Sequence, residues 1–311
     1  MHHALFTLSV VAVATGAYFF PGAFTSIGGQ PLQPLIKPLL QITMFGMGAT
    51  MAWRDFAAVA MNPKGVAIGI LCQFTIMPFV GYGLSRAFAF EPEVAAGVVL
   101  IGCAPSGLAS NVISYIAKAN VPLSITLTAC ATLLAPVVTP LLMKLLGGTL
   151  IEVDIDAMMW EIVQIVLLPI GVGLAMNQAL GRHARHLHAV LPVVSMAGIV
   201  AIVGIITAAG SSNLRAVGPS LVVCVLLHNC LGFAIGYGAG RLCRLSEQDA
   251  RTISIEVGMQ NGGLATGLAK AMGKVATTGL APILFATIMN VTGSGLAAIW
   301  ARRGLLDIDQ V

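Results

Sequence analysis

Long apolar runs separated by short polar stretches dominate this chain. An α-helix needs about 20 mostly apolar residues to cross a bilayer. Spans one, three, four and five are predicted at about 4–20, 65–84, 94–118 and 122–146, and span two follows a proline-punctuated stretch (Pro31, Pro34, Pro38) and ends at about Met51. Spans six to ten are predicted at about 158–180, 190–209, 219–240, 252–272 and 276–300. The pattern therefore predicts an all-α integral membrane protein with ten transmembrane helices.

Two of these spans contain residues that interrupt a helix. Span four includes Pro105 and Gly107, and span nine includes the pair Gly262 and Gly263. Proline removes a backbone donor, and adjacent glycines lower helix stability, so backbone groups are freed at both places. Freed backbone inside a membrane is tolerated only where it lines a cavity or is buried in protein. We expect spans four and nine to be broken.

The two halves of the sequence resemble each other. Gly-Leu-Ala-Ser at 107–110 matches Gly-Leu-Ala-Thr at 263–266, and the same offset of 156 pairs Gln73 with Asn229. Five spans in each half would place the second copy upside down in the membrane. We therefore expect a first repeat at 1–155 and an inverted second repeat at 156–311. Inverted repeats with matching broken helices predict a binding site near the bilayer midplane.

Composition excludes a soluble globular fold. Hydrophobic residues make up 57% of the chain and charged residues 9%, whereas a soluble domain has about 25% charged residues. The net charge of +4 is spread through loops, so nucleic acid is not an expected partner. Of the 16 Lys and Arg residues, ten fall on one predicted side and six on the other. This bias predicts that both termini are cytoplasmic in a multi-pass protein of the cell inner (plasma) membrane.

Glu256 falls about one turn inside predicted span nine. A carboxylate in hydrocarbon costs several kcal/mol, roughly, unless something neutralises it. Gln260 lies on the same helical face, next to carbonyls that the Gly262-Gly263 break would free. Oxygen-bearing side chains also follow the first break and share a face of span five: Ser110, Asn111, Ser124 and Thr128. One carboxylate with neutral oxygens suits sodium better than a divalent metal.

Other interpretations of these polar residues remain open. Glu256 could be an interfacial residue, and each hydroxyl could bond back to its own helix. Gln73 and Asn290 could form ordinary interhelical hydrogen bonds. Glu256 could instead be the proton site of a proton-coupled carrier. An intramembrane enzyme is a remote alternative, because the sequence lacks Walker, HExxH and G-x-S-x-G motifs.

The motif Glu-Val-Gly-Met-Gln-Asn at 256–261, with Ala-Ser-Asn at 109–111 and Gln73, resembles the bile acid:sodium symporter family in its ten-span bacterial form. The resemblance covers essentially the whole chain. It implies a five-plus-five inverted repeat with two domains. Spans 1, 2, 6 and 7 would form a panel domain, and spans 3–5 and 8–10 a core domain. Spans four and nine would be unwound and would cross in the core.

The resemblance also implies two sodium ions as coupling ions. Sodium site 1 would use Ser110, Asn111, Ser124, Thr128 and Glu256. Sodium site 2 would use Gln73, Glu256, Val257, Met259 and Gln260. Substrate would lie between panel and core, near Asn261, Asn290, Leu108 and Gly263. Some relatives have Thr at the position of Leu108, so the substrate of this chain is expected to differ from theirs.

The function expected from the residues and the resemblance is secondary active transport. Sodium-coupled symport would import an organic anion, either bile-acid-like or a small carboxylate such as pantoate, by alternating access. Backbone amides at 106–109 and 262–264 would favour an anionic group, because they lie at helix N-termini. The expected partners are the organic anion and the lipid bilayer, without an obligate protein partner.

Overall fold

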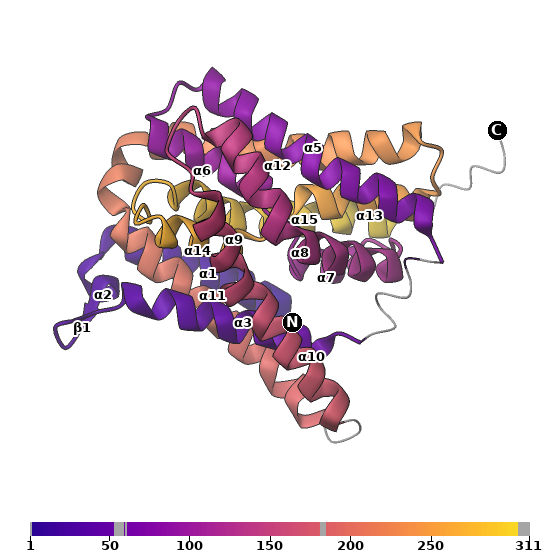
Figure 1. Cartoon of the computed structure of the whole chain (residues 1–311), viewed down its shortest axis with the longest axis horizontal. Helices are drawn as coiled ribbons and strands as arrows, with labels where there is room; N and C mark the ends of the chain where they lie inside the picture. The colour runs from indigo at the N-terminus through magenta and orange to yellow at the C-terminus, as the bar shows by residue number, and fades with distance from the viewer. Residues whose placement is uncertain (1, 53–58, 60, 181–184, 304–311) are drawn as a thin grey trace.

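The computed structural model describes residues 2–52, 59, 61–180 and 185–303, and nearly all of them are helical (Figure 1). A short hairpin of β1 (Ser26–Ile27) and β2 (Gln30–Pro31) is the exception. By their order along the chain the helices divide into two groups, which contact each other at several places. The two groups are built from segments that alternate along the chain, so neither group is a continuous piece of sequence.

The first group contains the helices that begin each half of the chain. Its members are α1 (His2–Phe19), α2 (Gly22–Thr25), η1 (Gln33–Leu35), α3 (Ile36–Thr50), α9 (Ile155–Ile162), η4 (Val163–Leu167), α10 (Leu168–Leu180) and α11 (Arg185–Ala209). Helix α3 packs between α10 and α11. A Cβ on Gly48 would lie 2.1 Å from the carbonyl oxygen of Ile170, and one on Gly173 would lie 2.3 Å from that of Phe45. Glycine at both positions lets the backbones of α3 and α10 touch.

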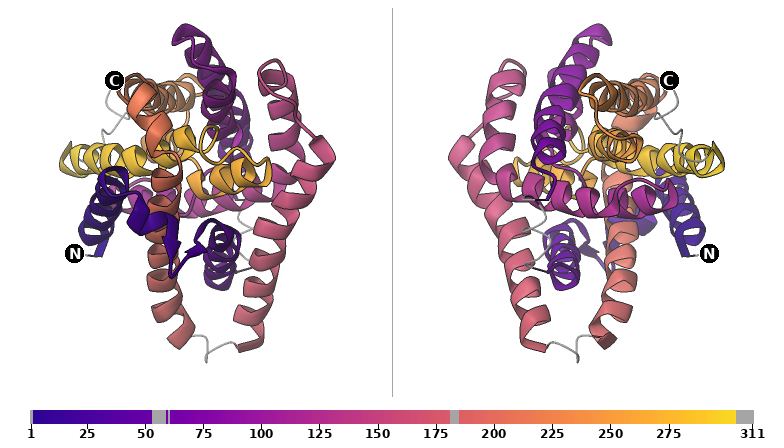
Figure 2. Two further views of the ribbon diagram at one scale, coloured as in Figure 1. Left: turned by 90° about the vertical axis from the view of Figure 1, so that its left-hand side faces the viewer. Right: turned by 90° about the vertical axis from the view of Figure 1, so that its right-hand side faces the viewer.

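The second group holds the remaining helices. Its members are α5 (Pro63–Ala87), α6 (Pro92–Cys103), α7 (Ala109–Ile116), α8 (Val121–Leu142), η3 (Met143–Gly147), α12 (Ser211–Leu242), α13 (Glu247–Gly258), α14 (Gly262–Ala271) and α15 (Leu280–Arg303). Helix α12 packs along α13, α5 and α15. In Figure 2, the C-terminal end of α10 and the N-terminal end of α11 project beyond this second group.

Several helices begin at side-chain caps that their sequence supplies. Asn62 accepts a hydrogen bond from the amide of Gly65 at the start of α5, and Asn120 accepts one from Leu123 at the start of α8. Proline follows each cap within two residues, where its missing N–H costs nothing. Ser246 caps α13 in the same way. Polar residues therefore define the ends of helices whose middles are apolar.

Five helical segments in the described residues are long and apolar enough to cross a membrane by length and composition. They are Pro63–Ala87, Val121–Gly147, Ile155–Leu180, Ser211–Leu242 and Leu280–Arg302. Shorter apolar helices occur at Leu8–Phe19, Pro92–Cys103 and Val193–Ala209. Large apolar side chains such as Phe79 and Leu145 are more than half exposed on the long helices. The fold is that of a multi-pass membrane protein.

Helix boundaries differ from the predicted spans mainly at polar ends. Helix α12 begins at Ser211 and contains Pro219, where the span was expected to start. Helix α13 begins at Glu247, before the expected start at 252. Apolar runs mark only the stretch that fits hydrocarbon, whereas a capped helix continues into the polar region beyond it.

Candidate ion and substrate site

The two interrupted spans cross each other at their breaks. The extended residues between α6 and α7 pair with those between α13 and α14 in an antiparallel bridge, Ser106 with Gln260. The amide of Asn261 donates to the carbonyl of Pro105 at 2.7 Å, and that of Gly107 donates to the carbonyl of Met259 at 3.3 Å. Each break therefore satisfies backbone groups that the other break has freed, far from water.

Glu256 lies in the last turns of α13 and is only 2% exposed. Its Oε1 accepts a hydrogen bond from Ser124 Oγ at 2.5 Å, and its Oε2 accepts one from Thr128 Oγ1 at 2.9 Å. Both hydroxyls come from α8, one turn apart. Asn111 Oδ1 lies 2.8 Å from Ser124 Oγ, and Ser110 Oγ lies 3.3 Å from Thr128 Oγ1. The five residues predicted for site 1 thus meet in one cluster.

Two hydroxyls of this cluster each lie within hydrogen-bond distance of two oxygen acceptors. The single hydroxyl hydrogen of Ser124 is shared between Glu256 Oε1 and Asn111 Oδ1, and that of Thr128 between Glu256 Oε2 and Asn111 Oδ1. A hydroxyl can donate only one hydrogen bond. These oxygens surround a buried carboxyl group, which stays charged only beside a counterion. This set of oxygen ligands fits a monovalent cation.

The residues predicted for site 2 are only partly joined. Gln73 Nε2 donates to Gln260 Oε1 at 2.7 Å and to the carbonyl of Ala104 at 3.0 Å, and Gln260 Nε2 donates to the carbonyl of Val257 at 2.6 Å. Gln73 Oε1 is buried without a hydrogen-bond partner in the described chain. Met259 donates its amide to the carbonyl of Ile255 at 2.9 Å, and its own carbonyl accepts from the amide of Gly107 in the first break. Glu256 accepts hydrogen bonds from Ser124 and Thr128 of α8.

Sequence reasoning missed Ser106 as a site residue. Its hydroxyl faces the carboxylate of Glu256, is buried, and makes no well-formed hydrogen bond in the described chain. Its place beside Pro105, inside the first break, was the signal that could have identified it. Ser106 adds another oxygen to the cluster.

Asn229 and Thr292 brace the second break and were not predicted to do so. Asn229 Nδ2 donates to the carbonyl of Gly258 at 2.7 Å, while its Oδ1 accepts from Thr292 Oγ1 at 2.5 Å. Gln73 braces the first break in the same way, because its Nε2 donates to the carbonyl of Ala104 at 3.0 Å. The offset that pairs Gln73 with Asn229 was the available signal for this role.

The four predicted substrate residues lie around the crossing but in different settings. Asn261 caps α14 through the amide of Leu264 at 3.0 Å, and Asn290 Nδ2 bonds back to the carbonyl of Ala286 at 2.6 Å. Leu108 is half-buried beside the first break. Gly263 is half-buried, and a Cβ there would lie 3.1 Å from Leu40 on α3. The structure places Gly263 where the two groups of helices meet.

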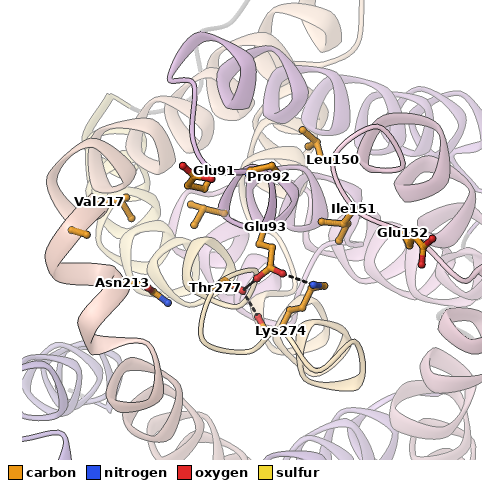
Figure 3. Close-up of a pocket in the computed structure, with 12 residues that line it drawn as sticks. Glu91, Pro92, Glu93, Leu150, Ile151, Glu152, Asn213, Val217, Lys274 and Thr277 are labelled. Atoms are coloured by element: carbon orange, nitrogen blue, oxygen red, sulfur yellow. Dashed lines mark hydrogen bonds and ion pairs between the residues drawn. The ribbon is translucent and has the colours of Figure 1, made fainter.

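A separate cavity of about 720 Å³ lies at the opposite end of α6 from the crossing (Figure 3). Its lining includes Glu91, Glu93, Glu152 and Lys274, and it contains none of the predicted ion-site residues. Glu93, in the turn before the expected start of span four, accepts hydrogen bonds from Lys274 and from Thr277 Oγ1. These two donors hold the pKa of Glu93 below its ordinary value.

Comparisons with known proteins agree with this arrangement. The model of the Sodium Bile acid symporter family matches residues 37–217. An uncharacterized sodium-dependent transporter of Bacillus subtilis is 38% identical over 299 residues, covering 96% of this chain and 91% of the relative. A probable chloroplastic sodium/metabolite cotransporter of Arabidopsis thaliana is 34% identical, covering 85% and 66%. The human ileal sodium/bile acid cotransporter is 31% identical, covering 76% and 69%.

These relatives are named as transporters that depend on sodium, and none is named as an enzyme. The family match covers more than half of the chain, and the Bacillus relative aligns over nearly all of it. The resemblance noted from Glu256 to Asn261 is therefore confirmed. This chain belongs to the Sodium Bile acid symporter family, a family of sodium-dependent transporters.

Proposed function

We propose that this protein imports an organic anion together with sodium across the inner (plasma) membrane. The observation that carries the proposal is the buried oxygen cluster around Glu256, in which the hydroxyls of Ser124 and Thr128 each face two acceptors. A sodium ion there would neutralise the carboxylate and accept the spare lone pairs. It would also link α7, α8 and α13, so sodium binding would stabilise the crossed breaks.

A second sodium ion would bind on the other side of the crossing. Gln73 Oε1 supports this step, because it is a buried amide oxygen without a partner in the described chain. The oxygen of Gln260 and the carbonyls of Val257 and Met259 would complete the set. Gln260 would first release its bond to Val257, so site 2 would form only when the ion arrives. Glu256 would then lie between two cations.

The substrate would bind between a panel formed by the first group of helices and a core formed by the second. Gly107, Gly262 and Leu264 already use their amides in hydrogen bonds. Only the remaining amides of the two turns, such as that of Gly263, are therefore offered to an anionic group. Asn261, Asn290 and Leu108 would contact the rest of the molecule. A small carboxylate or a bile-acid-like anion would fit this chemistry.

Alternating access would move the core against the panel. Helix α14 packs on α3, α9 and η4, whereas α7 packs mainly on α8, α13 and α15 of its own group. Helix α14, which follows the second break, is therefore packed against the panel. Helix α7, which follows the first break, packs mainly within the core. This asymmetry supports a state closed on the outside, with α7 on the cytoplasmic side together with both termini. The matched roles of Gln73 and Asn229 support an inverted repeat of residues 1–155 and 156–311.

Ion-dependent thermal stability of the purified protein in detergent tests this proposal. Sodium should raise the melting temperature saturably, and potassium and choline should not. A ligand that binds only the folded state adds about 2.7 kcal/mol at one hundred times its Kd. Glu256→Ala should abolish the sodium shift. Organic carboxylates should then add stability only in the presence of sodium.

Two results would overturn the proposal. A folded protein whose stability responds to pH but not to sodium would favour proton coupling through Glu256. A folded Glu256→Ala variant that keeps the full sodium shift would place the ion elsewhere.

A further inference from the structure

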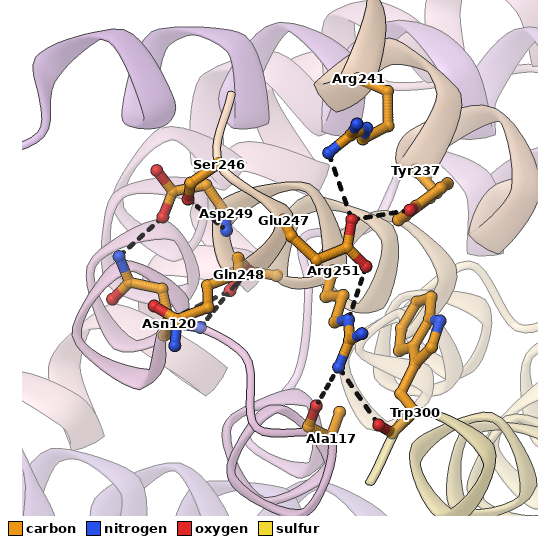
Figure 4. A network of polar contacts seen from close by, with 11 residues as sticks. Ala117, Asn120, Tyr237, Arg241, Ser246, Glu247, Gln248, Asp249, Arg251 and Trp300 are labelled. Carbon is orange, nitrogen blue, oxygen red and sulfur yellow. Dashed lines mark hydrogen bonds and ion pairs between the residues drawn. The ribbon is translucent and has the colours of Figure 1, made fainter. Parts of the chain in front are cut away.

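Asp249 lies near the start of α13 and accepts two side-chain hydrogen bonds from different parts of the chain. Asn120 Nδ2 donates to its Oδ1 at 2.7 Å, as Figure 4 shows. Asn62 Nδ2 donates to its Oδ2 at 3.1 Å. Both carboxylate oxygens are therefore engaged, each by one amide. These charge-assisted bonds are stronger than bonds between neutral groups.

The two asparagines are the caps of two other helices. Asn62 Oδ1 accepts from the amide of Gly65 at 3.0 Å to start α5, and Asn120 Oδ1 accepts from that of Leu123 at 3.1 Å to start α8. Their amide oxygens are thus held by backbone, which turns their NH₂ groups toward Asp249. One carboxylate joins the first turns of α5, α8 and α13.

These three helices present the candidate sodium ligands. Helix α5 carries Gln73, α8 carries Ser124 and Thr128, and α13 carries Glu256. A helix rises about 1.5 Å per residue, so Asp249 lies about 10 Å along α13 from Glu256. Ser124 is one turn beyond the Asn120 cap, whose carbonyl accepts its amide at 3.0 Å. A shift of this junction would therefore move the ligands along their helices.

Thr252 Oγ1 also ties α13 to α8, because it accepts from the amide of Asn120 at 2.9 Å, whereas Asn62 at the start of α5 is joined to α13 through Asp249. Arg251 is 1% exposed, pairs with Glu247 at 2.8 Å, and donates to the carbonyls of Ala117 and Trp300 (Figure 4). Those bonds tie α13 to the end of α7 and to α15. Among the hydrogen bonds of the described side chains, those of Asp249 are the ones that reach both ligand-bearing caps.

We infer that Asp249 is a positioning residue for sodium binding: it sets the relative register of the three helices that present the ligands. The inference rests on the proposed sodium sites. Residues that orient ion ligands without touching the ion commonly change metal affinity by about 10-fold or more when removed. Loss of this junction is expected to lower sodium affinity more than it lowers the stability of the sodium-free protein.

Asp249→Asn tests the inference in the full-length protein with sodium chloride as the probe. Asparagine replaces one carboxylate oxygen with an NH₂ group, so the cap that faced this oxygen loses its acceptor. The apparent sodium Kd from thermal-shift titration should rise about 10-fold, while the sodium-free melting temperature changes little. Glu93→Gln is the matched control, because it also neutralises a carboxylate that joins two core segments, but remote from the ligands. Its sodium Kd should equal that of the wild type.

A swapped pair provides the rescue. Asn120→Asp alone keeps the cap of α8 but sets two carboxylates against each other, so it should also raise the sodium Kd. In the double variant Asn120→Asp/Asp249→Asn, the new amide can donate to position 120 and accept from Asn62. Sodium affinity should then return toward the wild-type value.

The possible outcomes distinguish the positioning role of Asp249 from the proposed sodium sites themselves. Wild-type sodium affinity in a folded Asp249→Asn protein overturns the inference, and so does a swap that restores stability without restoring affinity. Should Asp249→Asn fail to fold, the comparison of Asn120→Asp with the swapped pair decides by the same criterion. No sodium response in the wild type overturns the proposed sodium sites themselves, and the inference with them.

Discussion

The hydroxyl of Ser124 lies 2.5 Å from the carboxylate of Glu256, and this contact joins two helices whose residues are 132 positions apart. The face of α8 that carries the hydroxyls of Ser124 and Thr128 contacts the last turns of α13, just before its break. The buried charge is thereby placed among neutral oxygens. The chemistry of the candidate site depends on how these two helices pack.

Removal of the α8 hydroxyls should weaken sodium binding. Ser124→Ala and Thr128→Val each delete an oxygen beside Glu256, and we expect each to raise the sodium Kd about 10-fold, since a coordinating oxygen is lost. Thr132→Val is the matched control, because Thr132 lies one turn further on α8 and bonds to the carbonyl of Thr128. Thermal-shift titration measures all three. An equal loss of affinity in Thr132→Val would show that the effect is not specific to the cluster.

Gln73→Ala should change the steepness of the sodium response. Its unpartnered Oε1 is the observation that supports a second ion, so its removal should leave one sodium ion bound at Ser124 and Glu256. We expect the Hill coefficient of sodium-dependent stabilisation to fall from near two to near one. Thr75→Val on the same helix, whose hydroxyl bonds to Leu71, is the control. A variant that keeps the wild-type steepness would contradict a site 2 built on Gln73.

Asn229→Ala should destabilise the protein. The substitution leaves the carbonyl of Gly258 buried without a donor, which costs about 1–3 kcal/mol. Asn213→Ala removes a similar bond, to the carbonyl of Ala276, at a more exposed position and should cost about 1 kcal/mol or less. Melting temperatures in sodium-free buffer compare the two. Equal losses would mean that the second break does not depend on Asn229.

Acid should weaken the link between Glu93 and its partners. Because hydrogen bonds from Lys274 and Thr277 hold the folded-state pKa of Glu93 below its ordinary value of 4.5, the carboxylate stabilises the fold above that pH. The contribution is lost as pH falls through the lower folded-state pKa. It is small, because the side chain is 39% exposed and water screens the charge. The melting temperature of Glu93→Gln should lie below that of the wild type at pH 7 and approach it as the pH is lowered below 4.5.

Much of the candidate site could be predicted before the fold was known. Glu256 and Gln260 stood out because polar groups are costly inside an apolar run. The breaks were visible because Pro105 and the Gly262-Gly263 pair interrupt helices by local chemistry. Ser106 and Asp249 were missed for the opposite reason. A serine in a turn and an aspartate in a charged loop are ordinary residues until their partners are known.

Sequence alone determined that the chain spans a membrane, where its helices break, and which polar residues lie within apolar segments. Those properties depend on residues that are adjacent in the chain, because the hydrophobicity and the helix propensity of a segment are set mainly by its own residues. Only the tertiary structure decided that Ser124 and Thr128 share the carboxylate of Glu256 and that Asp249 joins the caps of α5 and α8. Hydrogen bonds form over about 3 Å. Such distances between remote segments are set by the packing of whole helices, which local patterns do not determine.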